Sequence, residues 1–223
     1  MKKKILFVVT SHGELGNTGK RTGYFLSEVT HPYSVLSPEF DIDIVSPQGG
    51  EPPVDGFDLS DPINKKYWED PEWQYKMQNT MTPDDVDSSQ YVAIFYAGGH
   101  GAMWDFPDNT KLARIAKDIY ENGGYVAAVC HGPAGLLPIK LENGHYLIEG
   151  KKLDSFTNDE EKAHGTAKVV PFMLETALVE EGATFDNGPM WSDHVVVDGR
   201  LITGQNPFSA LSLGKKLLET LRR

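Results

Sequence analysis

Short apolar segments rich in β-forming residues alternate with helical patterns along most of this chain. Strands are expected at residues 4–10, 40–46, 91–96 and 125–129, and helices at residues 22–36, at residues 109–122 and from Pro207 through Leu221. Nearly continuous apolar strands are typical of a parallel sheet that is buried on both faces. The alternation therefore predicts an α/β fold, in which a mostly parallel sheet is covered by helices on both faces.

Turn signals predict the ends of several of these elements. The Asn-Gly-Gly sequence at residues 122–124 ends the preceding helix, because glycine adopts the left-handed cap conformation at little cost. Asp-Gly at residues 198–199 predicts a hairpin between strands at residues 194–197 and 201–203. Pro32 lies within the first helical pattern and predicts a bend there.

The length of the chain favours one domain that covers residues 1–223. Residues 47–64 are rich in Pro, Gly and Asp and are interpreted as a loop. The following residues 65–81 carry four aromatic side chains, Tyr67, Trp68, Trp73 and Tyr75. We expect these side chains to pack an inserted segment onto the body of the protein. The alternative is that both segments shape the entrance of a substrate site.

The charge balance limits the possible partners. The chain has 21 basic and 32 acidic residues, a net charge of −11, and the acids are scattered. Such a surface repels phosphate backbones and anionic lipids, so neither nucleic acid nor a membrane is expected as a partner. The apolar runs are too short to span a membrane, and the first one is too short for a signal peptide. One cysteine forms no internal disulfide, which favours a cytoplasmic protein.

That one cysteine, Cys130, stands where a strand passes into a predicted helix. A nucleophile elbow at such a junction requires small residues two positions to either side, since its strained turn brings neighbouring backbone segments close together. Ala128 and Gly132 satisfy this requirement. The amino terminus of the predicted helix, at residues 131–137, would also stabilise a thiolate. Cys130 is therefore predicted to be a nucleophile rather than a buried apolar residue.

His131 follows the cysteine directly and is the candidate base and acid. A third group is expected to orient its imidazole, by the logic of catalytic triads. The acidic residues Asp159, Glu160 and Glu161 follow a short apolar segment and are nearly equal candidates on sequence alone. Acidic residues at the start of a helix also serve simply to complement its dipole.

A glycine-rich turn at residues 97–101 follows the third predicted strand. Its backbone N–H groups, around Gly99, can form an oxyanion hole together with the amide of His131. The spacing is neither that of a phosphate loop nor that of a dinucleotide fingerprint. The histidines show no metal-type spacing, so neither a metal nor another cofactor is expected. Glu28 has no local signal that distinguishes it from a solvated helical glutamate.

Taken together, these segments resemble the ThiJ/PfpI superfamily, the class I glutamine amidotransferase-like proteins, and within it the heat-shock chaperone and glyoxalase III branch. The matching segments are TGYFLSEVTHP at residues 22–32, GHG at 99–101, AAVCHGPA at 127–134, LIEGK at 147–151, FT at 156–157 and DGRLITGQNP at 198–207. They extend over nearly the whole chain, and the motifs around the cysteine and in the first helix are specific.

The resemblance implies a flavodoxin-like sandwich that usually forms a homodimer. It implies Cys130 as nucleophile, His131 as its neighbour, Glu161 as the acidic partner and Gly99 at the oxyanion corner. It also assigns Glu28 to the position beside the sulfur, for which the resemblance supplies the entire argument. The implied reaction converts methylglyoxal or a related small 2-oxoaldehyde into a 2-hydroxy acid such as D-lactate, without glutathione or metal.

Two other functions compete with this one. The first is amide hydrolysis, as in a glutaminase subunit or a small peptidase. Amidotransferases have a His-x-Glu pattern far downstream of the cysteine. The best downstream histidine here, His194, is followed by two valines instead, so amide hydrolysis is the less favoured function. The second is not enzymatic: a stress chaperone, or a redox sensor in which Cys130 is an exposed thiolate that reports peroxide. A related protein deglycase activity belongs with the glyoxalase hypothesis.

Overall fold

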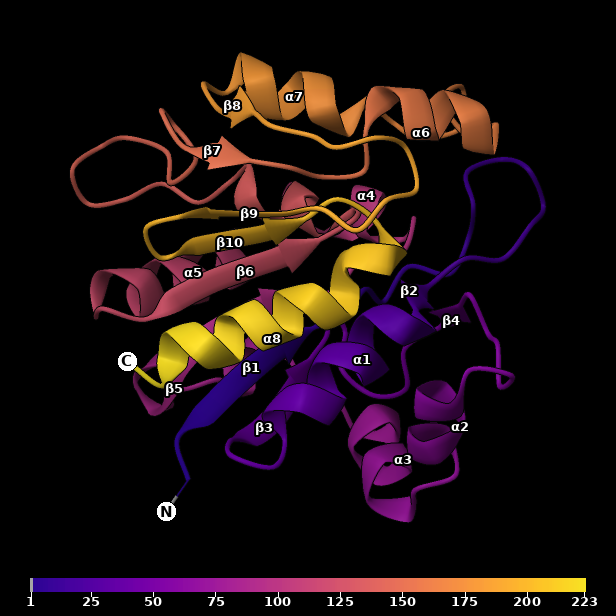
Figure 1. Ribbon diagram of the computed structural model, residues 1–223, viewed down its shortest axis with the longest axis vertical. Coiled ribbons are helices and arrows are strands. Elements are labelled where there is room, and N and C mark those ends of the chain that lie inside the picture. The colour runs from indigo at the N-terminus through magenta and orange to yellow at the C-terminus, as the bar shows by residue number, and fades with distance from the viewer. Residues whose placement is uncertain (1) are drawn as a thin grey trace.

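The main sheet of the protein has six strands, of which five run parallel. The computed structural model describes residues 2–223 (Figure 1). Across the sheet the strands are β3 (Asp41–Val45), β1 (Lys4–Val8), β5 (Tyr91–Tyr96), β6 (Tyr125–Val129), β10 (Leu201–Gly204) and β9 (Val195–Asp198). Only β9 runs antiparallel, to its neighbour β10. The parallel strands, numbered in chain order, follow the flavodoxin-like sequence 2-1-3-4-5, which confirms the predicted fold class.

Helices cover both faces of this sheet. The α1 helix (Leu26–Leu36) and the α8 helix (Ala210–Leu221) pack on one face, and α5 (Thr110–Glu121) and α7 (Leu174–Glu180) contribute to the apolar core of the other (Figure 1). An added Cβ at Gly214 in α8 would lie 2.8 Å from the Cα of Pro32 in α1, so the two helices approach closely there. The sheet is thus buried between two helical layers, as its apolar strands predicted.

Smaller elements surround this body. They are β2 (Tyr24–Phe25), β4 (Val54–Asp55), α2 (Pro62–Trp68), α3 (Pro71–Gln78), α4 (Ala102–Asp105), β7 (Lys152–Leu153), α6 (Asn158–His164) and β8 (Thr184–Phe185), with 3₁₀ turns η1 (Pro83–Asp85), η2 (Ser88–Gln90), η3 (Gly132–Leu136) and η4 (Pro207–Ser209). β2 pairs with β4 and β7 pairs with β8, each in a separate two-stranded sheet.

Most predicted element ends lie within two residues of the observed ones. The strands at residues 91–96 and 125–129 are confirmed to the residue, and the Asp-Gly turn joins β9 to β10. Asn109 accepts a hydrogen bond from the amide of Leu112 and caps α5. The last helix starts later than expected, at Ala210, because Pro207 opens a separate 3₁₀ turn.

The predicted start of the first helix, at residue 22, is wrong. The segment before Leu26 is extended, because the amide of Tyr24 donates to the carbonyl of Pro53 and the strand pairs with β4. A Cβ at Gly23 would lie 2.1 Å from that same carbonyl oxygen, so only glycine permits this approach. The helix then continues through Pro32 to Leu36.

The aromatic segment forms α2 and α3 and packs onto the body, as expected. Trp73 is fully buried and Tyr67 nearly so, while Tyr75 is exposed at its surface. None of the four aromatic side chains of this segment lines the main cavity described below. The alternative was that both segments shape the entrance of a substrate site. Of the two, the preceding loop does reach the cavity, and it contributes Asp55, Gly56 and Asp58 to the cavity wall.

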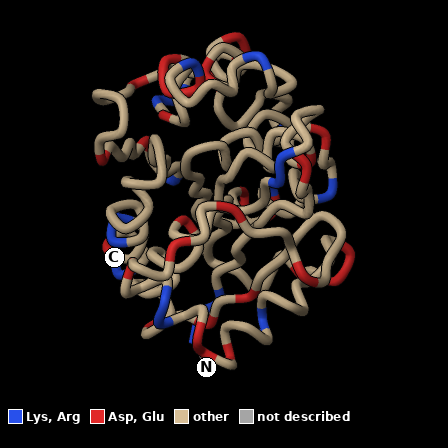
Figure 2. The backbone as a smooth tube through the Cα atoms, turned by 90° about the vertical axis from the view of Figure 1, so that its right-hand side faces the viewer, with Lys and Arg blue, Asp and Glu red and all other residues tan. Residues whose placement is uncertain are grey.

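Acidic residues are distributed over the whole fold. Figure 2 shows them spread along the backbone, with the basic residues interspersed between them. Throughout residues 2–223, every helix is too short or too polar to cross a bilayer.

Candidate active site

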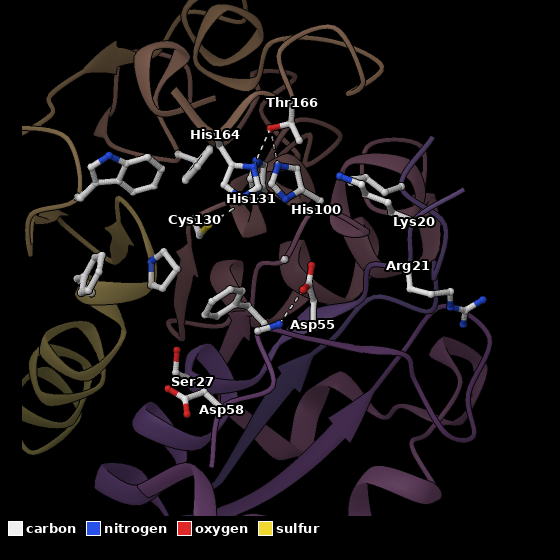
Figure 3. Close-up of a pocket in the computed structure, with 18 of the residues that line it drawn as sticks. Lys20, Arg21, Ser27, Asp55, Asp58, His100, Cys130, His131, His164 and Thr166 are labelled. Carbon is white, nitrogen blue, oxygen red and sulfur yellow. Dashed lines mark hydrogen bonds between the residues drawn. The ribbon is translucent and has the colours of Figure 1, made fainter. Parts of the chain in front are cut away.

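A cavity of about 960 Å³ opens where β5 and β6 end (Figure 3). Gly99 and His100 reach it from the turn after β5, and Cys130 and His131 reach it from the turn after β6. The carboxyl ends of parallel strands meet at one edge of a sheet, which is where open α/β folds place ligands. The glycine-rich turn and the cysteine turn, distant in sequence, are therefore brought together.

Cys130 lies on a strained turn, as the elbow motif predicted. Its φ of 61° falls in the left-handed region that residues other than glycine rarely adopt. The turn is held by hydrogen bonds on both sides, from the Cys130 amide to the carbonyl of Gly204 and from the Phe156 amide to the carbonyl of Cys130. A Cβ at Gly132 would lie 2.3 Å from the carbonyl oxygen of Tyr96, which explains the small residue there.

The helix predicted after the cysteine is instead η3, a five-residue 3₁₀ turn. Pro133 supplies no backbone N–H to a helical ladder, and a Cβ at Gly135 would lie 2.6 Å from the ring of Tyr96. So short a turn provides little of the helix dipole on which the expected stabilisation of a thiolate depended.

The resting sulfur is correspondingly a buried thiol rather than an exposed thiolate. Burial raises the pKa of Cys130 well above its ordinary value, and the charge of Glu28 and a hydrogen bond with it add to this effect. The expectation of a readily ionised thiol from the sequence is therefore wrong for this conformation. Cys130 is only 3% exposed, so oxidants reach it only through the cavity.

Glu28 is the buried carboxyl group next to that thiol. It is fully buried, its Oε2 accepts a hydrogen bond of 2.6 Å from the Gly98 amide, and its Oε1 has no partner among the described residues. Burial raises the pKa of Glu28 to about 8, against the hydrogen bonds with Cys130 and the Gly98 amide. Glu28 does not line the cavity. Its carboxyl group is thus placed to act on the sulfur rather than directly on a bound molecule.

His131 connects the sulfur to a second carboxylate. Its Nδ1 lies 3.4 Å from Sγ of Cys130, and its Nε2 lies 2.7 Å from Oε2 of Glu161. Because a carboxylate accepts hydrogen bonds, the proton of the neutral ring is assigned to Nε2, and Nδ1 presents a lone pair to the thiol. Burial lowers the pKa of His131 to about 4, helped by the neighbouring His100 and opposed by Glu161.

The geometry distinguishes the three acidic candidates. Glu161 contacts His131, whereas Asp159 is exposed and pairs with Lys162. Glu160 is buried and accepts hydrogen bonds from the side chains of Gln205 and Asn206. Burial acts to raise the pKa of Glu161, but its hydrogen bonds with His100 and His131 outweigh that and hold its pKa well below the usual range.

Sequence reasoning missed two partners of Glu161. Nε2 of His100 lies 2.7 Å from Oε1 of Glu161, and Oγ1 of Thr166 donates to the same oxygen. The His100 ring lies 4.1 Å from that of His131, and His164 lies beside both (Figure 3). The sequence did contain a sign of the role of His100, because this residue follows a predicted strand. The site lies at the edge of the sheet where such strands end. Nothing local distinguished Thr166.

The oxyanion corner predicted at Gly99 borders the cavity. Neither the Gly99 amide nor the His131 amide donates to a protein acceptor among residues 2–223. Gly98 makes the approach possible, since its Cβ would lie 2.8 Å from the His131 nitrogen and 2.5 Å from Oε2 of Glu28. Two amides without a protein acceptor, on residues that line the same cavity as Cys130, fit the stabilisation of a developing oxyanion.

His100, His131 and Glu161 also offer potential metal-ligating atoms that lie within 4.8 Å of one another. The spacing in sequence gave no sign of this group. Each imidazole, however, already contacts a different oxygen of Glu161 at 2.7 Å, so these atoms are satisfied as hydrogen-bonding partners. In this structure the three residues form a hydrogen-bonded group in which Glu161 joins the two imidazoles. That the site needs no metal stays a prediction.

His194 lies apart from this constellation. Its Nε2 contacts the carbonyl of Asp186, and it does not line the cavity. The cavity wall also includes charged residues from the amino-terminal third of the chain, among them Lys20, Arg21, Asp55 and Asp58 (Figure 3).

Comparison with known proteins extends over the whole chain. A model of the DJ-1/PfpI family matches residues 22–220. A glutathione-independent glyoxalase of Saccharomyces cerevisiae is 35% identical over 240 residues, covering 99% of this chain and 98% of that protein. Glyoxalase 3 of Candida albicans is 32% identical over 229 residues, covering 96% and 97%.

Solved structures agree with these sequence matches. The crystal structure of glyoxalase III from Candida albicans superposes with a TM-score of 0.91 at 30% identity and covers 97% of this chain and 96% of its own. The structure of the Rapid Encystment Protein of Francisella tularensis gives a TM-score of 0.94 at 42% identity, covering 98% and 99%.

Proposed function

This chain belongs to the DJ-1/PfpI family, and from that premise we propose that it is a glutathione-independent glyoxalase. Its substrate class is small 2-oxoaldehydes such as methylglyoxal, and its products are the corresponding 2-hydroxy acids. Similarity to curated glyoxalases over the full length supports the reaction class. The observation that carries the proposal is the position of His131, with Nδ1 next to the sulfur of Cys130 and Nε2 on Glu161.

The first step forms a bond between Sγ of Cys130 and the aldehyde carbon. The thiol proton passes to Nδ1 of His131, and the resulting imidazolium is stabilised by the Glu161 carboxylate. The amides of Gly99 and His131 stabilise the charge on the aldehyde oxygen until it receives the proton. The product is a hemithioacetal, and no electrons have left the substrate.

The second step moves hydrogen between the two substrate carbons. His131 removes the proton from the former aldehyde carbon, and an enediol forms as the neighbouring carbonyl oxygen takes up a proton. A proton then returns to the second carbon while the first hydroxyl loses one, which leaves a thioester with a 2-hydroxy group. The first carbon is oxidised and the second is reduced, so the step is internally balanced. His131 suits this task better than Glu28 because it lines the cavity and Glu28 does not.

Water completes the reaction by adding to the thioester. The carbon–sulfur bond breaks, the sulfur recovers its proton and the 2-hydroxy acid leaves. We assign to Glu28 the control of the charge on the sulfur in each step, because its carboxyl group is buried beside the thiol and its charge raises the pKa of Cys130.

The competing functions receive less support. Amide hydrolysis of the amidotransferase kind lacks its downstream histidine, since His194 lies outside the cavity. A peroxide sensor needs an accessible thiol of low pKa, whereas Cys130 is buried and its pKa is raised.

The test is turnover of methylglyoxal by purified protein without glutathione, with lactate measured by chiral chromatography. The wild type should form D-lactate, Cys130→Ser should form none, and His131→Asn should lose about 10²–10⁴-fold in rate. His194→Asn is the matched control and should keep wild-type activity, because the imidazole of His194 contacts Asp186 and does not line the cavity. Consumption of no methylglyoxal by folded wild-type protein would reject the function.

A further inference from the structure

The cavity is much larger than a three-carbon oxoaldehyde requires. Its volume of about 960 Å³ lies near the top of the roughly 300–1,000 Å³ range of pockets that enclose drug-sized ligands. Methylglyoxal has only a few non-hydrogen atoms and would fill a small part of this space. The remaining walls therefore indicate what else the substrate carries.

Three aromatic residues that line the cavity, Phe156, Trp191 and Phe208, are here called the aromatic shelf. Phe156 packs on the catalytic ring of His131 with centroids 4.5 Å apart. Trp191 packs on Phe156 with centroids 5.6 Å apart. Apolar surface thus extends without interruption from the imidazole next to the sulfur toward the outside of the cavity.

Trp191 is held in this place against its own backbone preference. Its φ is 62°, a conformation that costs a bulky residue free energy and persists only where its surroundings enforce it. Its amide donates a hydrogen bond of 2.8 Å to Oε1 of the buried Glu160. Strain of this kind is concentrated at functional sites.

The same carboxylate also positions Phe208. Asn206 donates from its side-chain nitrogen to Oε1 of Glu160 at 2.9 Å. Its Oδ1 accepts a hydrogen bond of 3.0 Å from the Phe208 amide. Glu160, which borders the catalytic Glu161, therefore supports the two outer aromatic residues of the shelf.

Both outer residues keep much of their apolar surface uncovered. Trp191 is 39% exposed and Phe208 is 63% exposed, although both line the cavity. A ligand with an apolar group would cover them and gain free energy in proportion to the area removed from water.

From this geometry we propose that the site selects 2-oxoaldehydes with a bulky apolar substituent, such as an aryl group, and that the aromatic shelf is the specificity determinant. The inference rests on the proposed glyoxalase function. The substituent on the ketone carbon lies on the shelf while the aldehyde carbon meets Cys130.

The test compares kcat/KM for phenylglyoxal and methylglyoxal in the wild type, Trp191→Ala and Phe208→Ala. The wild type should prefer phenylglyoxal, and each substitution should reduce the ratio of the two kcat/KM values, phenylglyoxal over methylglyoxal, by about tenfold. Tyr75→Ala is the control, since Tyr75 is 70% exposed and lies outside the cavity. An equal or lower rate with phenylglyoxal, or a preference that the shelf variants retain, would overturn the proposal.

Binding provides a readout that does not depend on turnover. Calorimetry of Cys130→Ala with mandelate and lactate, the 2-hydroxy acids of the two substrates, should show tighter binding of mandelate that is lost in Cys130→Ala/Trp191→Ala. These acids also avoid the reaction of phenylglyoxal with arginine, which concerns Arg21 in the cavity wall. Equal binding of both acids contradicts the role of the shelf.

These measurements distinguish failure of the glyoxalase function from failure of the aromatic shelf as specificity determinant. Failure of the wild type to convert either aldehyde rejects the glyoxalase function, and the binding measurement still decides on the shelf. If Trp191→Ala leaves the substrate preference unchanged but alters the oligomeric state in light scattering, the shelf is a contact between copies of the chain and the specificity proposal fails.

Discussion

Glu28 and Cys130 are buried neighbours, each of which shifts the pKa of the other. Two acids so close in an apolar environment cannot both ionise, so they titrate as a pair that shares its protons. The pair loses its first proton near pH 8, the value to which burial raises the pKa of Glu28. Below that pH both groups are protonated in most molecules, and above it one negative charge is shared between them.

The first prediction concerns stability. The folded protein keeps the Glu28 proton up to about pH 8, whereas a glutamate in the unfolded chain releases it near 4.5. Folding therefore binds a proton between these pH values, and stability falls as pH rises through that window. Glu28→Gln keeps the shape without the charge, so it should exceed the wild type by about 2–5 kcal/mol at pH 8 and match it near pH 4.5. Denaturant unfolding at both pH values measures this, and a pH-independent difference would contradict the assignment.

The second prediction concerns the pH dependence of turnover. The reactive form carries one negative charge on the Glu28–Cys130 pair, so kcat/KM for the aldehyde should rise with pH and level off above about pH 8. Glu28→Gln removes the group that titrates near pH 8, so the midpoint of the rise in kcat/KM should no longer lie near pH 8. The rate should also fall by about 10²–10⁴-fold. Initial rates in constant-ionic-strength buffers give the profile. A profile that is flat between pH 6 and 9 in the wild type would exclude this role.

The third prediction assigns His100 as a positioning residue. It fixes one oxygen of Glu161 and acts to lower the pKa of His131, which lies at about 4. His100→Leu should raise the pKa of His131 and reduce kcat about tenfold with little change in KM, while His100→Gln, which keeps an N–H donor, should restore part of the rate. An NMR titration of the His131 ring measures the pKa directly. His145→Gln, at an exposed histidine, should change neither quantity.

The fourth prediction tests the elbow. Gly132→Ala adds a Cβ only 2.3 Å from a backbone oxygen that cannot move aside, so it should cost about 2–3 kcal/mol or more and lower turnover. Gly188→Ala is the control, because its Cβ meets the movable Ser192 side chain at 3.1 Å. Its stability should stay within about 0.5 kcal/mol of the wild type. Equal stability of the two variants would mean that the turn tolerates a side chain.

The tight turn at Cys130 and the fold class were predictable because their causes are local. Alternating apolar strands and helical patterns specify a covered parallel sheet, and the small residues around Cys130 specify the tight turn. The carboxyl end of α5 was equally predictable, since the amides of the two glycines after Asn122 donate to carbonyls of the same helix. The start of α1 was not, because a hydrogen bond between Tyr24 and Pro53, far apart in sequence, keeps that segment extended.

The sequence by itself determined that a cysteine would stand at the end of a strand with His131 beside it. Only the tertiary structure decided that the thiol is protonated at rest, that Glu161 rather than Glu160 meets the imidazole, and that His100 shares that carboxylate. The physical reason is that pKa values and hydrogen-bond partners depend on burial and on neighbours from other strands. Those neighbours meet only when the sheet has assembled.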